Sequence, residues 1–432
     1  MEYKKSVYQF SQAIHPKIYL CTSFISGYHI LLSKEVYALY NLSKLSLLRE
    51  RFPKVFQRLL EGEFVINKSI DELNLIQEKR KKEIADTSLY HIIINPTLDC
   101  NLSCWYCYEN RVPNSTMTDE IVEAIKKHIV LHYERVPYKT LKLSFFGGEP
   151  FLGFNTIKKI VSFASDYCEE KGFELLLDFT TNGTLCTKST LEFLSSYKCL
   201  FQITLDGDKE QHNKIKYTHC KSIDTFSLTI KNIRDIQRYI KDSRVAIRIN
   251  YDKDTLLSFN SILNELLPLD RKRTKVILKK IWQVDSKDIS REQLDGVMQL
   301  LFENKFVVDY YSQGGICFAD RKNQAVFNYD GYVFKCTTID RFDEDNSLGV
   351  LEQTTGNILW KTEKMQYLED FTPQECKECV MYPTCGGPCQ KRFSEDSNWS
   401  CFLKNTHFNL SEYVLTQFKT HLIKHQIYDD EE

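Results

Sequence analysis

Cysteine is the residue type that most constrains what this chain can fold into. The 432 residues contain 15 cysteines, against 16 glycines and 10 prolines. Five are scattered and are typical of small buried side chains, whereas the other ten fall into two groups of close spacing. A disulfide-rich secreted scaffold is short and carries a signal peptide, but this chain is long and begins MEYKKSVYQF, without an apolar segment. We therefore interpret the grouped cysteines as metal ligands or redox groups.

Composition excludes several classes of function. Hydrophobic residues make up 42% and charged residues 27% of the chain, which is typical of a globular protein with sizeable cores. The formal net charge of -1 gives no bulk attraction to nucleic acid or to an anionic membrane. No apolar run reaches the roughly 18 residues that a membrane helix needs. We expect a cytoplasmic protein with neither nucleic acid nor membrane as a partner.

The middle of the chain alternates apolar runs with helical patterns. Such alternation predicts parallel β-α-β units, as in an open barrel or a doubly wound sheet. The expected strands are Tyr90–Asn95, Leu141–Phe146, Glu174–Thr180, Leu200–Leu205, Val245–Asn250 and Lys275–Ile281. In such folds the chemistry gathers where the strands end.

Polar or metal-binding motifs follow four successive strands. The first cysteine group follows the first strand, and Gly147, Gly148 and Glu149 follow the second. The third strand ends in Thr181-Asn182-Gly183 and the fourth in Asp206-Gly207. Core packing alone does not require such motifs at consecutive strand ends, so we predict one site that all four share.

The first cysteine group is Cys100, Cys104 and Cys107, spaced C-x3-C-x2-C. Structural zinc takes four protein ligands, and no fourth Cys or His lies nearby. Three thiolates on a cubane iron–sulfur cluster leave one iron open. The segment LDCNLSCWYCYEN resembles the cluster loop of the radical S-adenosylmethionine (SAM) superfamily. That resemblance implies a [4Fe–4S] cluster whose open iron binds SAM, which an electron splits into methionine and a 5′-deoxyadenosyl radical.

The resemblance extends to the other strand ends and implies which residues contact SAM. Gly147-Gly148-Glu149-Pro150 is similar to the family's GGEP motif, Thr181-Asn182-Gly183 to its TNG turn, and ITLDG to its S-[IL]-DG element with Thr204 in place of Ser. Lys216 stands where the family usually has Arg, and because Lys lacks a bidentate fork we assign it no SAM-carboxylate role. The implied SAM-binding residues are Tyr106, Gly147, Gly148, Glu149, Thr181, Asn182, Thr204 and Arg248.

The second cysteine group comprises Cys317, Cys336, Cys376, Cys379, Cys385, Cys389 and Cys401, and its core spacing is C-x2-C-x5-C-x3-C. This arrangement resembles the SPASM domain of peptide-modifying radical SAM enzymes. By position, Cys317, Cys336 and Cys389 would hold auxiliary cluster I, and Cys376, Cys379, Cys385 and Cys401 would hold auxiliary cluster II. With the first cluster this gives three [4Fe–4S] clusters.

Cluster I lacks one expected ligand. No cysteine lies between the first two positions of the group, so an open iron, a bound substrate or an oxygen ligand such as Asp320 are the alternatives. A zinc ribbon of the four central cysteines is the other interpretation of this region.

The full prediction is an α/β chain of four parts. Residues 1–88 form a small α+β, winged-helix-like domain for leader-peptide recognition, and residues 89–305 a partial (β/α)6 radical SAM barrel. Residues 306–405 form the SPASM domain and residues 406–432 a C-terminal helix. The short strands and helices before the charged run Asp71–Asp86 carry no motif, so the leader role rests on the maturase resemblance.

The resemblance implies an enzyme that abstracts hydrogen from a peptide. The first candidate installs a thioether or a carbon–carbon crosslink in a ribosomally made precursor peptide that carries a leader, and takes electrons from a flavodoxin or ferredoxin. The alternative is an anaerobic sulfatase-maturing enzyme that makes formylglycine, although that branch typically has Asp where Thr337 follows Cys336. A non-catalytic peptide-binding protein is a third candidate, which the intact cysteine ligands oppose. No residue has a spacing that singles it out as the catalytic base.

Overall fold

The computed structural model consists of two compact units that are built from interleaved segments of the chain. Unit 1 comprises Met1–Ala85, Tyr311–Arg321 and Gln366–Lys419, and unit 2 comprises Asp86–Tyr310, Lys322–Met365 and Thr420–Glu432. The structure describes residues 2–218, 223–281, 283–285, 289–310, 316–339, 341–361, 372–391, 401 and 410–428.

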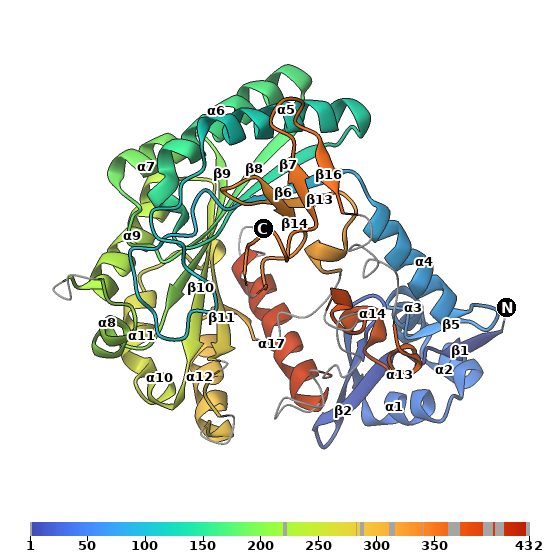
Figure 1. Cartoon of the computed structure of the whole chain (residues 1–432). Helices are drawn as coiled ribbons and strands as arrows, with labels where there is room; N and C mark the ends of the chain where they lie inside the picture. The colour runs from blue at the N-terminus through green and yellow to red at the C-terminus, as the bar shows by residue number, and fades with distance from the viewer. Residues whose placement is uncertain are drawn as a thin grey trace. The chain divides into compact units, whose positions relative to one another are not determined.

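Unit 2 is organised around six parallel strands that follow one another in both sequence and space (Figure 1). Each pairs in parallel with the next, which confirms the predicted β-α-β order. The strands are β6 (Leu89–Ile94), β7 (Thr140–Phe145), β8 (Glu174–Thr181), β9 (Lys198–Leu205), β10 (Ser243–Tyr251) and β11 (Thr274–Lys280). Their sequences are rich in Ile, Leu, Val and Phe, as expected of strands that are covered on both faces.

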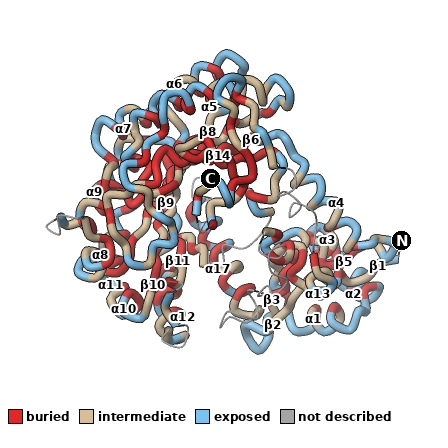
Figure 2. Tube along the Cα trace, in the orientation of Figure 1, coloured by how far each residue is buried: buried red, intermediate tan, exposed pale blue. Residues whose placement is uncertain are grey.

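Amphipathic helices connect these strands and bury one face against them. In Figure 2 the strands are buried, while the outer sides of the flanking helices are exposed. The connections are α5 (Asp119–Arg135), α6 (Phe154–Lys171), α7 (Lys188–Leu194), α8 (Lys209–Ile215), α9 (Thr225–Tyr239), α10 (Lys253–Leu257) and α11 (Phe259–Leu266). Because all six strands run parallel, their carboxyl ends lie at one end of the barrel.

The central sheet extends beyond the six strands on both sides and contains eleven strands within the described residues. On one side β12 (Val307–Asp309), which α12 (Arg291–Glu303) precedes, pairs in parallel with β11. On the other side β13 (Gln324–Phe327) pairs in parallel with β6. Three antiparallel strands complete this side: β14 (Tyr332–Phe334), β15 (Gly349–Leu351) and β16 (Ile358–Trp360). The first part of the predicted SPASM segment therefore continues the sheet of the barrel.

The N-terminal part of unit 1 is a small α+β fold. A three-stranded antiparallel sheet is followed by three short helices, whose buried faces meet around Tyr40, Leu48 and Leu59. Residues 45–61 form two helices and not one, because Pro53 begins a new helix after Phe52. The elements are β1 (Tyr3–Lys5), β2 (Gln9–His15), β3 (Ile18–Ser23), β4 (His29–Ser33), α1 (Lys34–Asn41), α2 (Leu45–Arg51), α3 (Pro53–Glu61), β5 (Val65–Asn67) and α4 (Glu72–Ala85).

Part of the cysteine-rich region folds against this N-terminal part within unit 1. The Tyr8 hydroxyl donates to the carbonyl of Lys377 at 2.8 Å, and the Thr384 hydroxyl donates to the carbonyl of Phe24 at 3.1 Å. Tyr8 and Tyr382 share an apolar cluster with Ile76 of α4. The helices of this region are α13 (Gln374–Lys377), α14 (Tyr382–Cys385) and α17 (Leu410–Tyr428), the last of which continues into unit 2.

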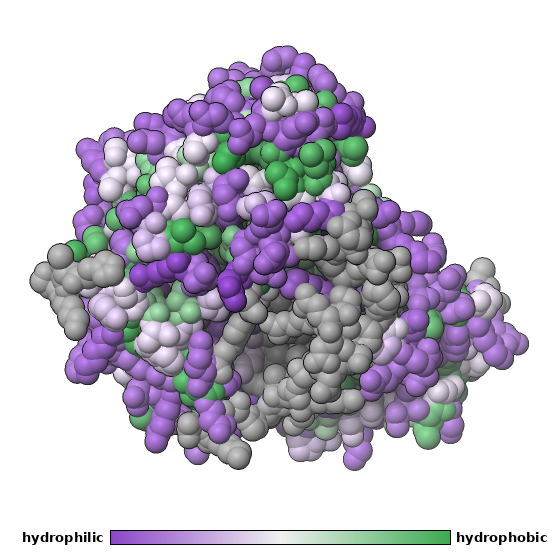
Figure 3. All heavy atoms as spheres, in the orientation of Figure 1, coloured by the Kyte–Doolittle hydropathy of each residue, from purple (hydrophilic) through white to green (hydrophobic). Residues whose placement is uncertain are grey.

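The surface is mostly hydrophilic on the face that Figure 3 shows, and hydrophobic residues gather there near α5 and β16. Leu359 of β16 is 57% exposed. Within the described ranges, no helix combines the length and the apolar character that crossing a membrane would take.

Candidate active site

A cavity of about 180 Å³ lies where the six parallel strands end, and we call it the strand-end cavity. Of the eight predicted SAM-binding residues, seven line it: Tyr106, Gly147, Gly148, Thr181, Asn182, Thr204 and Arg248. The three cysteines of the first group, Cys100, Cys104 and Cys107, line it as well. The structure thus brings together motifs that the sequence spreads over about 150 residues, as the parallel topology predicts.

The three-cysteine loop follows β6 and is held by its own backbone. The Leu102 amide lies 3.5 Å from Cys100 Sγ, and the Cys107 amide donates to the carbonyl of Cys104 at 3.2 Å. Burial raises the pKa of all three thiols, in the case of Cys100 to about 12. Within the described residues no three Cys, His, Asp or Glu side chains adopt a metal-binding geometry. Three soft sulfur donors that line one cavity nevertheless fit the chemistry of an iron–sulfur cluster with one open iron.

Gly147 and Gly148 bring the backbone of the second strand end against this loop. Both have positive φ, 83° and 51°. A Cβ on Gly148 would lie 2.1 Å from the carbonyl oxygen of Asp99, directly before Cys100. The Glu149 amide donates to that same carbonyl at 2.9 Å. The two glycines are therefore required for the close approach of the two loops.

Glu149 does not line the strand-end cavity and is fully buried, at 0% exposure. Its carboxylate accepts hydrogen bonds from the Thr181 hydroxyl at 2.8 Å, the Asn182 amide at 2.8 Å and the Phe151 amide at 3.1 Å. Burial raises the pKa of Glu149, although these donors oppose the shift. Within the protein, Glu149 ties the second strand end to the third, and its contact with SAM stays a prediction.

Asn182 connects the third strand end to the cysteine loop. Its Nδ2 donates to Asn101 Oδ1 at 2.9 Å and lies 3.9 Å from Cys100 Sγ. Its Oδ1 accepts from the Thr184 amide at 2.9 Å, which fixes the orientation of the side-chain amide. Asn182 therefore links the third strand end to the loop at Asn101, next to the first thiol.

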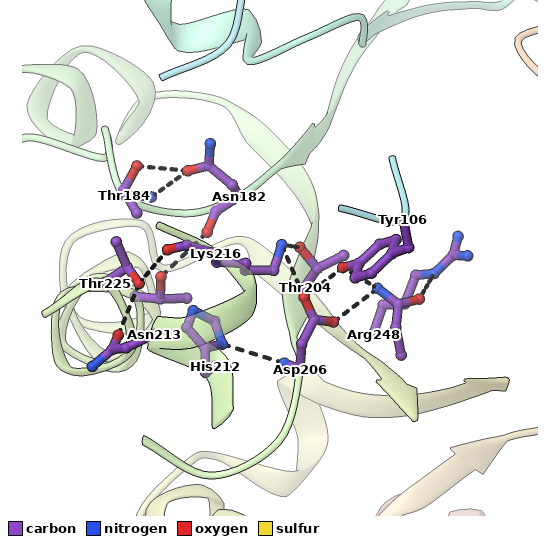
Figure 4. Close-up of polar contacts among 12 residues, drawn as sticks. Tyr106, Asn182, Thr184, Thr204, Asp206, His212, Asn213, Lys216, Thr225 and Arg248 are labelled. Atoms are coloured by element: carbon purple, nitrogen blue, oxygen red, sulfur yellow. Dashed lines mark hydrogen bonds and ion pairs between the residues drawn. The ribbon is translucent and has the colours of Figure 1, made fainter. Parts of the chain in front are cut away.

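A buried polar network lies at the fourth strand end, and Figure 4 shows its side chains. Lys216 Nζ donates to Thr204 Oγ1 at 2.5 Å and lies 3.4 Å from the carboxylate of Asp206. Burial alone would lower the pKa of Lys216, but the negative charge of Asp206 reverses the effect and raises it. Because Lys216 is paired within the protein, its ammonium holds Thr204 and Asp206 in place.

Asn250 of β10 links this network to the arginine. Its Nδ2 donates to Asp206 Oδ1 at 3.0 Å and to the Tyr106 hydroxyl at 3.1 Å, while its Oδ1 accepts from Arg248 Nε at 2.9 Å. The Tyr106 hydroxyl also donates to Asp206. These hydrogen bonds attach Tyr106, a residue of the cysteine loop, to the wall of the barrel.

Sequence reasoning did not single out two further residues of the cavity. Asn250 is the last residue but one of the fifth strand, β10, so its position near a strand end was the available signal. Glu109 lies two residues after Cys107, and its Oε2 accepts from the Gly148 amide at 2.6 Å. Burial raises the pKa of Glu109 to about 7. Glu109 is thus a second carboxylate, after Glu149, that holds the glycine turn, and unlike Glu149 it lines the cavity.

The seven cysteines of the second group lie in both units. Cys376, Cys379, Cys385 and Cys401 belong to unit 1, and the other three thiols of this set influence the pKa of Cys376, which burial raises to about 12. This placement is consistent with one shared site for these four. Cys317 and Cys389 lie in unit 1 and Cys336 follows β14 in unit 2, and their convergence on one cluster stays a prediction.

Family models match both cysteine regions. Residues 94–262 match the radical SAM superfamily, and residues 317–380 match the SPASM iron–sulfur cluster-binding domain. The cysteine-type anaerobic sulfatase-maturating enzyme of Clostridium perfringens is 25% identical over 343 residues, which cover 69% of this chain and 88% of the relative.

Solved structures show the same fold. Native anSMEcpe with bound AdoMet and Cp18Cys peptide has a TM-score of 0.55 and 20% identity, and the match covers 79% of this chain and 98% of that chain. Streptococcus suis SuiB bound to precursor peptide SuiA has a TM-score of 0.51 and 14% identity, covering 94% and 100%. The chain therefore contains a radical SAM domain and an SPASM iron–sulfur domain and is homologous to the anaerobic sulfatase-maturating enzymes.

Proposed function

We propose that this protein is a radical SAM/SPASM maturase that modifies a ribosomally made peptide. The observation that carries the proposal is the strand-end cavity, where three thiols, the glycine turn and Arg248 line one space. A [4Fe–4S] cluster held by Cys100, Cys104 and Cys107 would supply the electron that splits SAM and so yields a 5′-deoxyadenosyl radical. The radical would take a hydrogen atom from the peptide.

The residues of the cavity would bind and orient SAM. Gly147 and Gly148 offer backbone at close range, and Asn182 and Thr204 present polar atoms that the protein itself fixes. Arg248 Nε donates a hydrogen bond to Asn250 Oδ1, and the other N–H groups of Arg248 would bind the carboxylate of SAM. Lys216, Asp206 and Glu149 position these groups from behind, and each is at most 3% exposed. Preorganised polar groups of this kind hold a reacting molecule without reorganisation.

The proposed substrate is a precursor peptide and the product a thioether or a carbon–carbon crosslink. Two neighbours of the same fold support a peptide substrate, since anSMEcpe was solved with Cp18Cys peptide and SuiB with precursor peptide SuiA. Forming such a bond after hydrogen abstraction releases one more electron, for which two auxiliary clusters would provide an acceptor. An electron donor such as a flavodoxin or ferredoxin would reduce the first cluster.

The N-terminal part of unit 1 is the proposed site of leader recognition. Its sheet has the order β2-β3-β4, so β4 is an edge strand, and Leu31 on β4 is 48% exposed. An extended peptide can add to such an edge through main-chain hydrogen bonds and place alternate side chains on the sheet. Leu31→Asp should weaken leader binding and leave SAM cleavage without peptide unchanged.

A formylglycine-generating activity is the second candidate. The 25% identity with the Clostridium perfringens enzyme favours it. Thr337 opposes it, because it follows Cys336 where that branch typically has an Asp base. Incubation with a cysteine-containing sulfatase peptide distinguishes the two, since formylglycine is detected directly as an aldehyde. A peptide-binding protein without catalysis, the third candidate, predicts no deoxyadenosine at all.

The deciding experiment measures 5′-deoxyadenosine after anaerobic reconstitution and chemical reduction. Wild-type protein should form it, and the Cys100→Ala/Cys104→Ala/Cys107→Ala variant should not, because the only proposed site of SAM cleavage is removed. Cys168→Ala/Cys199→Ala is the matched control, since these buried thiols lie outside the strand-end cavity. Deoxyadenosine at the wild-type rate in the triple variant would exclude the proposed chemistry.

A further inference from the structure

Unit 2 contains a second and larger cavity of about 490 Å³, which we call the basal cavity. It lies near the amino-terminal ends of β10, β11 and β12, away from the strand ends that carry the cysteine loop. Its walls come from the strands and from the end of α17. The lining residues that the argument uses are Lys142, Asp178, Gln202, Arg244, Lys275 and Lys424.

The charge of the basal cavity is strongly positive. Its lining contains six cations and a single carboxylate, Asp178; the cations are Lys142, Arg244, Lys272, Arg273, Lys275 and Lys424. A chain with a net charge of -1 has no general excess of cations that would produce this cluster by chance. A concave surface lined by one sign of charge concentrates ligands of the other sign.

Three of these cations are already paired with carboxylates. Lys142 lies 2.6 Å from Asp178, Arg273 lies 2.7 Å from Asp270, and Lys275 lies 3.7 Å from Asp309. Among the residues that the structure describes, Arg244 and Lys424 have no carboxylate within salt-bridge distance. Arg244 projects from β10 and Lys424 from α17, so two different elements direct unpaired positive charge at one cavity.

The end of α17 is anchored as one wall of the cavity. The Tyr428 hydroxyl donates to the carbonyl of Lys272 at 2.8 Å, and the Thr420 hydroxyl donates to the carbonyl of Val308 at 3.4 Å. Lys424 lies between Thr420 and Tyr428 in the sequence. The two contacts therefore hold the part of α17 that carries Lys424 against the strands. The cationic wall is therefore part of the folded unit.

Much of the remaining lining is apolar, and this indicates the class of ligand. Leu200, Ala246, Ile277 and Val307 all line the basal cavity. A free inorganic anion makes no favourable contact with apolar side chains, whereas a peptide with acidic side chains has both carboxylates and apolar aliphatic groups. The size and the mixed lining thus fit an acidic peptide segment better than a single small anion.

Gln202 connects the basal cavity to the proposed reaction site. This residue of β9 lines both cavities, and Thr204, two positions further on the same face of the strand, lines the strand-end cavity. A peptide held by Arg244 and Lys424 would therefore lie on the same inner surface of the barrel as the cavity that holds SAM.

We propose that the basal cavity binds an acidic segment of the peptide substrate through Arg244 and Lys424. The inference rests on the proposed function and adds to it the charge of the substrate. Acidic residues in the peptide would set the position of the modified residue relative to the strand-end cavity.

Fluorescence anisotropy with two labelled octapeptides tests the inference on the reconstituted full-length protein. One peptide alternates alanine with glutamate and the other alanine with glutamine. The wild type should bind the glutamate peptide about tenfold more tightly at low salt, because two unpaired cations gain partners. Arg244→Gln/Lys424→Gln should bind both peptides equally.

The matched control is Arg238→Gln/Lys253→Gln, which removes the same charge from two exposed residues that do not line the basal cavity. It should keep the preference for glutamate. An equal loss of the preference in both double variants, or its persistence in the cavity variant, would overturn the inference.

Asp429–Glu432 are acidic residues that lie outside the described residues. Binding is therefore also measured with a variant of the full chain in which these four residues are changed to the corresponding amides. A glutamate preference in either background supports the inference, and its absence from both overturns it. Binding is measured without reductant, and deoxyadenosine formation is assayed separately in the same preparations. A preserved preference without SAM cleavage would count against the proposed function alone.

Discussion

Gly148 shows how single residues build this site by allowing two backbones to meet. Its positive φ of 51° and the nearness of the Asp99 carbonyl leave no room for a side chain. Glu149 and Glu109 then hold the turn on either side, one through Thr181 and Asn182 and the other through the Gly148 amide. The motif residues therefore hold one another in position, in addition to lining the space proposed for a ligand.

Gly148→Ala should destabilise the protein by about 1–3 kcal/mol and prevent loading of the first cluster. The added Cβ would force the turn away from Asp99, in addition to the cost of a strained backbone. Iron per chain after anaerobic reconstitution and the thermal midpoint provide the measurement. Gly172→Ala is the control, because Gly172 also has positive φ, 73°, but nothing lies within 4 Å of its Cβ position. Equal iron contents in the two variants would contradict the prediction.

The sequence predicted the residues of the strand-end cavity well because each motif directly follows a strand, and parallel strands bring their ends together. It could not predict the roles of Lys216 and Asp206, since their pairing depends on how α8 returns to the barrel. Glu109 was missed because nothing in its local pattern distinguishes a carboxylate that folds back on Gly148 from an exposed one. Contacts of this kind depend on tertiary structure.

At the scale of elements, α5 joins the barrel to the antiparallel strands that extend its sheet. His128 of α5 is buried, with Nδ1 2.8 Å from the carbonyl oxygen of Gly356, between β15 and β16, and Nε2 2.6 Å from the Tyr90 hydroxyl of β6. Burial lowers the pKa of His128 to about 4. The neutral imidazole therefore connects three elements.

Stability should fall as the pH drops below about 6.5, because unfolded His128 then binds a proton that the folded imidazole resists down to a pKa of about 4. When the pH is lowered from 7 to 5, the free energy of unfolding should fall by about 2 kcal/mol more in the wild type than in His128→Gln. Urea unfolding at both values measures this. His15→Gln, at an exposed position, should behave like the wild type. An identical pH dependence in His128→Gln would refute the assignment.

At the scale of the whole molecule, the units do not follow the order of the chain. Unit 1 joins residues 1–85 to residues 366–419, although about 280 residues separate these segments. No sequence pattern indicated that these two segments would pack together. The contacts that join them, such as those of Tyr8 and Thr384, use ordinary side chains and backbone carbonyls. The N-terminal part was predicted as a separate recognition domain, and the structure places it in one unit with six of the seven cysteines of the second group.

Deletion of residues 2–85 should therefore remove auxiliary iron as well as leader binding. Tyr382 and the segment around Cys376 would lose the apolar surface of Tyr8 and Ile76. From about twelve irons in the full chain, expected for three [4Fe–4S] clusters, about four should be lost. Iron and sulfide analysis with electron paramagnetic resonance measures the change, and Leu31→Asp should retain the full content. A soluble truncated protein with full iron would show that cluster II is independent of the N-terminal part.

The continuous eleven-stranded sheet has a consequence for recombining this protein with its relatives. A chimera joined near residue 306 would take β13 from a foreign parent and would have to rebuild its pairing with β6. The antiparallel strands up to Trp360 join the sheet through β13. A mismatch between β13 and β6 would therefore displace all of them. A junction after residue 361 leaves the sheet with one parent, and cysteine-rich segments should be exchanged there.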